Sequence, residues 1–240
     1  MTRTALVTGA AGGLGALAAR RLAAAAWDVV AVDADAEGLA RTALRSPNMH
    51  VRTCDVTDPG AVADVVAMAG SVQRVVHASA VPPAGPTLEQ PPDEVERALR
   101  TGVLGAVNVV RATLPGMLER GSGELILCPA HPEPDVPDGP APASMTTASM
   151  TTASMATGSM ITAAVAAYAD ALFAEHGGRG VTIRCCAAPP GVAPRLVLDA
   201  VDRSLARPAA EVRVTPAPGL RRLLPARAAR GAAAGGFAPR

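Results

Sequence analysis

The sequence predicts one doubly wound α/β domain, in which a parallel sheet of about seven strands is covered by helices on both faces. Three observations predict this fold. Strand-type and helix-type segments alternate through the first two-thirds of the chain. The strand-type segments are continuous apolar runs, typical of strands buried on both faces. The first of them runs directly into a glycine-rich turn at residues 8–15, which an Ala/Leu/Arg-rich helical segment follows.

The expected elements follow from these patterns in order. Apolar, mostly Val-rich runs predict strands at 4–8, 28–33, 49–54, 73–78, 124–128, 181–187 and 211–214. The segments between them predict helices at 13–26, 35–44, 58–69, 93–118, 163–176 and 196–205. Asp58 is placed to cap the third helix, with Pro59 suited to its first position, and Gly177 ends the fifth.

Composition limits the class of protein. The chain has 240 residues and a net charge of +1, which argues against nucleic acid as the main partner. We find no apolar run long enough to cross a membrane and no export signal at the N-terminus, so we expect a cytoplasmic location. The four cysteines lack metal-ligand spacing, which favours buried, reduced thiols and predicts no metal site.

Residues 129–158 interrupt the alternation. They begin with a proline-punctuated acidic stretch and continue into tandem pentads of the form Ser-Met-Thr-Thr-Ala, which extend to residue 163. A period of five matches neither helix nor strand, so we favour a surface loop or a frayed helix extension. Two alternatives are a methionine-lined lid over an apolar ligand and copper binding through thioethers. Residues 1–215 form the expected domain, and the basic residues 216–240 predict a C-terminal helix or tail, with a membrane or partner anchor as the alternative.

The glycine turn and four other segments resemble the short-chain dehydrogenase/reductase superfamily, over roughly residues 4–214. The resemblance implies a Rossmann-type fold, a nicotinamide dinucleotide cofactor, and dimers or tetramers formed through the helices at 93–118 and 163–176. In the turn, the residues that match the cofactor motif are Gly9, Gly13, Leu14 and Gly15. Asp33 follows about 20 residues later, where its carboxylate accepts from ribose hydroxyls and repels a 2′-phosphate, so NAD(H) is favoured over NADP(H).

The other three matches place the rest of the cofactor. Asp55 and Val56 resemble the family's adenine-contacting pair, and Ala78 and Ser79 occupy the segment that approaches the adenosine ribose. Pro190 and Gly191 resemble the family's turn that contacts the nicotinamide amide.

The family's catalytic tetrad is absent. The chain contains no lysine, so the family's Tyr-Lys pair cannot be present. Aligned through the flanking segments, the asparagine, serine, tyrosine and lysine correspond to Gly102, Ala130, Gly158 and Thr162. The single tyrosine, Tyr168, lies too far along the helix to substitute and is expected to pack. Loss of all four groups removes the proton donor and its support together.

Other side chains expected near the same edge of the sheet are candidates for general acid/base chemistry. His131, with Glu133 close behind, and His77 follow predicted strands, and an imidazole oriented by a carboxylate is a general acid/base. The alternative makes His131 an ordinary loop residue and His77 a packing residue against the adenosine.

We therefore expect an NAD(H)-binding protein that performs a non-redox step, such as cyclisation, dehydration, isomerisation or epimerisation, on a small biosynthetic metabolite. One alternative is an NAD(H)-dependent oxidoreductase that uses an unusual acid such as His131. Another is a non-catalytic protein that senses NAD(H) or acts as a scaffold.

Overall fold

Within the described residues the sheet has seven parallel strands, as the sequence predicts, and their order is β3-β2-β1-β4-β5-β6-β7. The computed structural model describes residues 3–44, 46–79, 86–129, 155–188, 192–206 and 213–214. The strands are β1 Thr4–Thr8, β2 Asp28–Asp33, β3 Met49–Thr53, β4 Arg74–His77, β5 Gly123–Leu127, β6 Val181–Cys186 and β7 Arg213–Val214. The strand order reverses between β1 and β4, and ligands of such sheets bind at the carboxyl edge beside this switch point.

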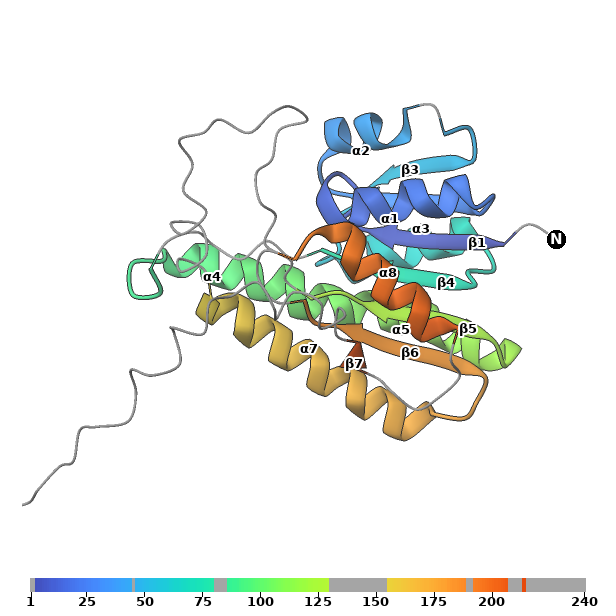
Figure 1. Cartoon of the computed structure of the whole chain (residues 1–240). Helices are drawn as coiled ribbons and strands as arrows, with labels where there is room; N and C mark the ends of the chain where they lie inside the picture. The colour runs from blue at the N-terminus through green and yellow to red at the C-terminus, as the bar shows by residue number, and fades with distance from the viewer. Residues whose placement is uncertain are drawn as a thin grey trace, which may run out of the picture.

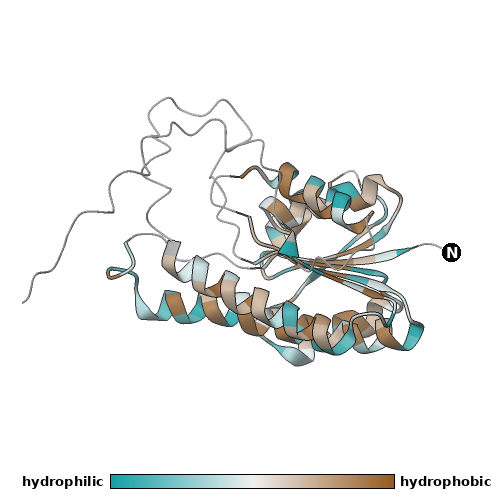
Figure 2. Cartoon of the chain, turned by 60° about the horizontal axis from the view of Figure 1, so that its bottom comes forward, coloured by the Kyte–Doolittle hydropathy of each residue, from teal (hydrophilic) through white to brown (hydrophobic). Residues whose placement is uncertain are grey.

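Helices cover both faces of the sheet (Figures 1 and 2). They are α1 Gly13–Ala24, α2 Ala36–Ala43, α3 Pro59–Ala69, α4 Pro92–Leu99, α5 Gly105–Arg120, α7 Met155–His176 and α8 Pro194–Leu205, together with the π-helix η1 Arg100–Leu104. One core packs β-sheet side chains against α1, α2 and α8, and the other packs them against α3, α5 and α7. Both cores consist mainly of Val, Leu, Ile and Ala, as the low aromatic content requires.

Two acidic N-caps fix helix starts at the carboxyl edge. The Asp58 carboxylate accepts hydrogen bonds from the N–H groups of Gly60 and Ala61, at 2.8 and 3.1 Å, which confirms the predicted cap of α3. Asp35 does the same for α2 through the N–H groups of Glu37 and Gly38. Each cap satisfies backbone donors that the helix itself leaves without partners.

The helix expected at residues 93–118 is not continuous. The π-helix η1 separates α4 from α5, and it contains Gly102, the position assigned from the sequence to the tetrad's asparagine. Short π segments inside α-helices are frequent at functional sites, where they redirect backbone groups. Helical periodicity in the sequence does not distinguish i→i+4 from i→i+5 bonding, so the prediction missed this interruption.

The helix expected at residues 163–176 begins eight residues earlier, at Met155, inside the repeats. Thr157, Ile161 and Val165 are buried at a spacing of four, so the repeat happens to present one packing stripe to the core. The structure thus describes regular helix from Met155 onward, with Thr157 and Ile161 buried, while the earlier pentads and the tail after residue 214 lie outside the described residues.

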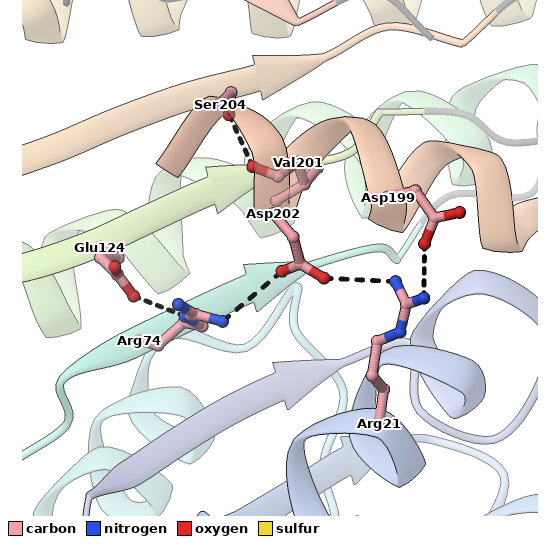
Figure 3. Close-up of polar contacts among 7 residues, drawn as sticks. All are labelled: Arg21, Arg74, Glu124, Asp199, Val201, Asp202 and Ser204. Carbon is pink, nitrogen blue, oxygen red and sulfur yellow. Dashed lines mark hydrogen bonds and ion pairs between the residues drawn. The ribbon is translucent and has the colours of Figure 1, made fainter. Parts of the chain in front are cut away.

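A charged network ties α8 to the amino edge of the sheet (Figure 3). Arg21 of α1 pairs with Asp199 and Asp202 of α8, and Arg74 of β4 pairs with Glu124 and Asp202. The Arg74 guanidinium also lies 4.7 Å from the centre of the Trp27 ring. Most of these groups are substantially exposed, so the network orients α8 rather than supplying much stability.

All four cysteines are buried and free, as expected. Burial raises the pKa of the Cys185 and Cys186 thiols to about 11 and about 12. Tyr168 also packs against the core, as the sequence predicts. Among the described helices, the stretch Ala156–His176 has the length and mean hydropathy, 1.2, of a membrane span, although a third of it is buried against this domain.

Candidate dinucleotide site

The glycine turn lies between β1 and α1 and allows unusually close backbone approaches. Gly9 has a φ of +70°, and a Cβ atom there would lie 2.6 Å from the carbonyl oxygen of Ala78. A Cβ at Gly15 would lie 2.0 Å from the carbonyl oxygen of Gly9. Both positions therefore require glycine, which brings β4, the turn and α1 into one compact cradle.

The N-terminus of α1 is open to an anion. Gly12 occupies the N-cap without any side-chain cap, and the first turn, which begins at Gly13 and includes Leu14, holds no acidic residue. The Leu14 side chain is buried in the core, so it offers only its backbone N–H on the outer side. Uncapped N–H groups and the positive end of the helix dipole suit a diphosphate.

Asp33 ends β2 beside this turn, as predicted. One carboxylate oxygen accepts the N–H of Ala11 at 3.0 Å, and the other accepts the N–H of Asp35 at 3.0 Å. These bonds fix the orientation of the carboxylate, while each oxygen keeps a lone pair for a further donor. The carboxylate is therefore held in one orientation beside the glycine turn, with acceptor capacity to spare.

The predicted adenosine contacts lie at the same edge. Asp55 and Val56 follow β3, and Ala78 and Ser79 follow β4, with the Ala78 N–H bonded to the Thr8 carbonyl at 3.2 Å. The strand order places β3, β2, β1 and β4 side by side, so these segments and the glycine turn lie along one edge of the sheet. Pro190 and Gly191 lie outside the described residues, as do Ala130, His131 and Glu133.

The residues assigned from the sequence to the tetrad, where the structure describes them, come from elements in mutual contact. Gly102 is buried in η1, and Gly158 and Thr162 lie half-buried one helical turn apart on α7, which packs against η1. Next to them, the Thr157 hydroxyl donates to the Gln90 side-chain oxygen at 2.7 Å in a buried hydrogen bond. Figure 1 shows α4 and the first turns of α7 extending beyond the carboxyl ends of the strands. None of the three tetrad positions supplies a group with a pKa suited to proton transfer.

His77, a predicted catalytic residue, is buried at the end of β4. It is 1% exposed, and its Nδ1 is hydrogen-bonded to the Thr8 hydroxyl at 2.8 Å. Its Nε2 has no hydrogen-bond partner among the described residues, and burial lowers the pKa of the imidazole to about 4. This environment favours the packing alternative for His77 over an acid/base role.

The buried imidazole predicts acid sensitivity. Because the folded pKa is about 4 and the unfolded value is 6.5, the unfolded chain binds the proton first. The contribution of His77 to the free energy of unfolding is complete above pH 6.5 and is lost as the pH falls to about 4, by about 3 kcal/mol. Urea titrations from pH 7 to pH 4 should show a smaller loss in His77→Asn than in the wild type.

The buried Thr113, whose hydroxyl donates to the Val109 carbonyl at 2.8 Å, provides the control. Thr113→Val removes a buried polar group but no titratable one, so it should keep the wild-type pH dependence. If the free energy of unfolding fell equally with pH in the wild type and in His77→Asn, His77 would not be the group that titrates between pH 6.5 and pH 4.

The described residues fit a nicotinamide dinucleotide. The turn has no room for a Cβ at Gly9 or Gly15, the start of α1 is uncapped, and the Asp33 carboxylate is held beside both. Sequence reasoning missed Asn108, whose amide donates to the Val56 carbonyl at 3.0 Å, and the Thr157–Gln90 bond. Neither belongs to a local motif, because each joins segments more than 50 residues apart.

The fold and this site define the class of protein. A model of the short chain dehydrogenase family matches residues 3–129, more than half of the chain, and the chain belongs to this family. Members of the family bind nicotinamide cofactors and small-molecule substrates, and they often form oligomers. The matched segment contains the glycine turn, Asp33 and the segments after β3 and β4, and it ends before α7.

Individual relatives are similar over part of their length. The chain is 32% identical over 121 residues to a 2-keto-3-deoxy-L-fuconate dehydrogenase of Xanthomonas campestris pv. campestris, covering 50% of this chain and 40% of the relative. It is 33% identical over 129 residues to an NAD(+)-dependent 2-dehydro-3-deoxy-L-rhamnonate dehydrogenase of Sphingomonas sp., covering 52% of each. The chain thus spans about half the length of these curated relatives.

Solved structures support the same fold. A variant actinorhodin polyketide ketoreductase with NADPH has a TM-score of 0.74 at 21% identity, covering 91% of this chain and 97% of that one. A short-chain dehydrogenase from Streptomyces avermitilis has a TM-score of 0.72 at 19% identity, covering 91% and 89%.

Proposed function

We propose that this chain binds NAD(H) at the carboxyl edge of its sheet and converts a small metabolite there without hydride transfer. The supporting observation is the pair Gly158 and Thr162 on α7, at the positions where the family resemblance expects tyrosine and lysine. Glycine has no side chain, and a threonine hydroxyl neither titrates near neutral pH nor provides a positive charge. Gly102 removes a third member of the tetrad.

The preference for NAD(H) over NADP(H) rests on Asp33. Its carboxylate is oriented by the N–H groups of Ala11 and Asp35, and a 2′-phosphate beside it would meet like charge. The name of the Sphingomonas relative agrees with this preference, whereas the ketoreductase structure contains NADPH.

The reaction classes that need only acid/base chemistry are cyclisation, dehydration, isomerisation and epimerisation. His131 with Glu133 remains the proposed acid/base pair, because His77 is buried and bonded to Thr8. A polyketide-like or deoxy-sugar-acid metabolite fits the substrates named for similar proteins.

The test combines calorimetry with product analysis. NAD+ should bind to the purified protein, and a converted metabolite should have the same oxidation state as its precursor by mass spectrometry. Absorbance at 340 nm should stay constant during conversion. Turnover of NADH in step with product would refute the proposal.

The second candidate is NAD(H)-dependent oxidoreduction, which the dehydrogenase names of the relatives favour. In that case a carbonyl compound such as a 2-keto-3-deoxy sugar acid should oxidise NADH, and His131→Ala should abolish the change at 340 nm. A non-catalytic sensor or scaffold is the remaining alternative, and it would bind NAD(H) while converting nothing.

We also propose that the protein forms a homodimer or homotetramer through α5 and α7. One face of α7 is exposed and consists mostly of small residues, namely Ala156, Ser159, Met160, Ala163, Ala167 and Ala171. Small side chains allow two helices to approach closely, and burying this face would remove Met160 and its neighbours from water.

Substitution at the centre of this face tests the oligomer. Ala167→Arg should convert the wild-type oligomer to a monomer of 24.0 kDa in sedimentation velocity experiments. The control Ala24→Arg, an exposed alanine at the end of α1, should leave the oligomer intact. A wild-type monomer at tens of micromolar, or an oligomer that persists in Ala167→Arg, would contradict this interface.

A further inference from the structure

The loop between β3 and α3, residues 54–58, is held by hydrogen bonds from several directions. The Cys54 N–H donates to the Asp33 carbonyl at 2.9 Å, and the Thr57 N–H donates to the Asp55 carboxylate at 2.8 Å. The Asp58 N–H closes a turn onto the Asp55 carbonyl at 3.0 Å. These bonds define the loop's backbone but leave Val56 itself to be fixed by other parts of the chain.

Helix α5 fixes Val56 on two sides. The Asn108 side-chain amide donates to the Val56 carbonyl at 3.0 Å. One turn earlier, Gly105 lies so close that a Cβ there would be 2.7 Å from Cγ2 of Val56. Val56 is 5% exposed, so its carbonyl and side chain both face the protein. A bond from an amide on a regular helix is a rigid way to hold a loop carbonyl.

Two groups of this loop keep hydrogen-bonding capacity. Within the described part of the chain, the Val56 N–H donates no hydrogen bond, and one oxygen of the Asp55 carboxylate accepts none. A donor beside an acceptor complements adenine, which presents an acceptor at N1 and a donor at N6. Hypoxanthine presents a donor at N1–H and an acceptor at O6. The Val56 N–H would then face a donor and the Asp55 carboxylate an acceptor, so both pairs repel.

We propose that Asn108 is a positioning residue that fixes Val56 and thereby sets a preference for adenine over hypoxanthine in the bound dinucleotide. The inference rests on the proposed NAD(H) binding and adds to it the selection of the base. Asn108 touches no ligand. It holds the Val56 carbonyl, and thereby the backbone that carries the two selecting groups, the Val56 N–H and the Asp55 carboxylate. Without that bond Val56 can rotate, and the donor and acceptor lose their fixed relation to the base.

The test compares two dinucleotides by calorimetry, NAD+ and nicotinamide hypoxanthine dinucleotide. The wild type should bind NAD+ at least about 10-fold more tightly, since a mismatched hydrogen-bonding edge leaves polar groups unpaired. Asn108→Leu removes the donor while keeping a similar side-chain size, and it should reduce this ratio to about 2-fold or less. Asn108→Gln, which keeps an amide donor, should restore part of the preference.

Asn48 provides a matched control. Its amide also donates to backbone carbonyls, those of Ala23 and Trp27 at 3.0 and 2.6 Å, but it lies at the amino edge of the sheet, just before β3. Asn48→Leu should lower the thermal midpoint and leave the base preference unchanged. General loss of stability therefore cannot imitate the expected result.

Each remaining outcome has one meaning. A folded Asn108→Leu that keeps the wild-type ratio overturns the role of Asn108 and leaves the proposed function intact. A wild type that binds NAD+ and hypoxanthine dinucleotide equally also overturns the inference alone. A wild type that binds neither overturns the proposed function and this inference with it. If Asn108→Leu does not fold, Asn108→Ser supplies the same comparison with a smaller change.

Discussion

Gly9→Ala should abolish measurable NAD+ binding, with a decrease in affinity of at least about 100-fold. The new Cβ would lie 2.6 Å from the Ala78 carbonyl oxygen, and the residue would have to keep a φ of +70°. The atoms nearest to this Cβ, from Ala78 and Ser79, are all backbone, so the turn itself must move away from β4. That movement disrupts the cradle in which the diphosphate would bind, and calorimetry with NAD+ measures the loss directly.

Gly70→Ala is the control for Gly9→Ala, because it imposes backbone strain without a clash between the new Cβ and neighbouring atoms. Gly70 ends α3 with a φ of +68°, and a Cβ there would have no atom within 4 Å. This variant also forces an alanine into a positive φ, at a cost on the order of 1–3 kcal/mol of the free energy of unfolding, but without the clash. It should bind NAD+ as the wild type does. Normal NAD+ affinity in Gly9→Ala would show that the cofactor does not use this turn.

Asp33→Asn should lower NAD+ affinity by about 10- to 100-fold and narrow the difference between NAD+ and NADP+. Both carboxylate oxygens accept backbone N–H groups, from Ala11 and Asp35, and an asparagine presents an NH2 to one of these donors. The variant thus loses the charge that repels a 2′-phosphate and the fixed orientation for ribose hydroxyls. Competitive calorimetry with both dinucleotides gives the two affinities.

Asp64→Asn is the charge-matched control, because Asp64 is exposed on α3 and the substitution changes net charge equally. Its affinities for both dinucleotides should match those of the wild type. If Asp33→Asn retained a wild-type preference for NAD+, the assignment of cofactor selectivity to Asp33 would be wrong.

The sequence predicted the sheet well because each strand carries its own local signal. Thr4–Thr8 and Asp28–Asp33 match their predicted limits, since each is a short apolar run that ends at a polar or glycine-rich turn. The predicted cap at Asp58 also formed, because N-capping depends on a few consecutive residues. Asp33 reached its expected place for the same reason.

What the sequence did not predict depends on contacts between distant segments. The start of α7 at Met155 accompanies two contacts with distant segments, the buried hydrogen bond from Thr157 to Gln90 and the burial of Ile161 in the core, neither of which the five-residue repeat reveals. The burial of His77 and the bond between Asn108 and Val56 arise only when β4, α5 and the β3–α3 loop come together. No local pattern contains that information.

The most direct test of the central claim is a titration of the purified protein with NADH, followed by addition of ketones and aldehydes while absorbance at 340 nm is recorded. The account predicts saturable NADH binding by calorimetry and no decrease in absorbance above the rate without protein, because Gly102, Gly158 and Thr162 carry no side chain that titrates near neutral pH. Steady oxidation of NADH over many turnovers with any of these compounds would contradict it.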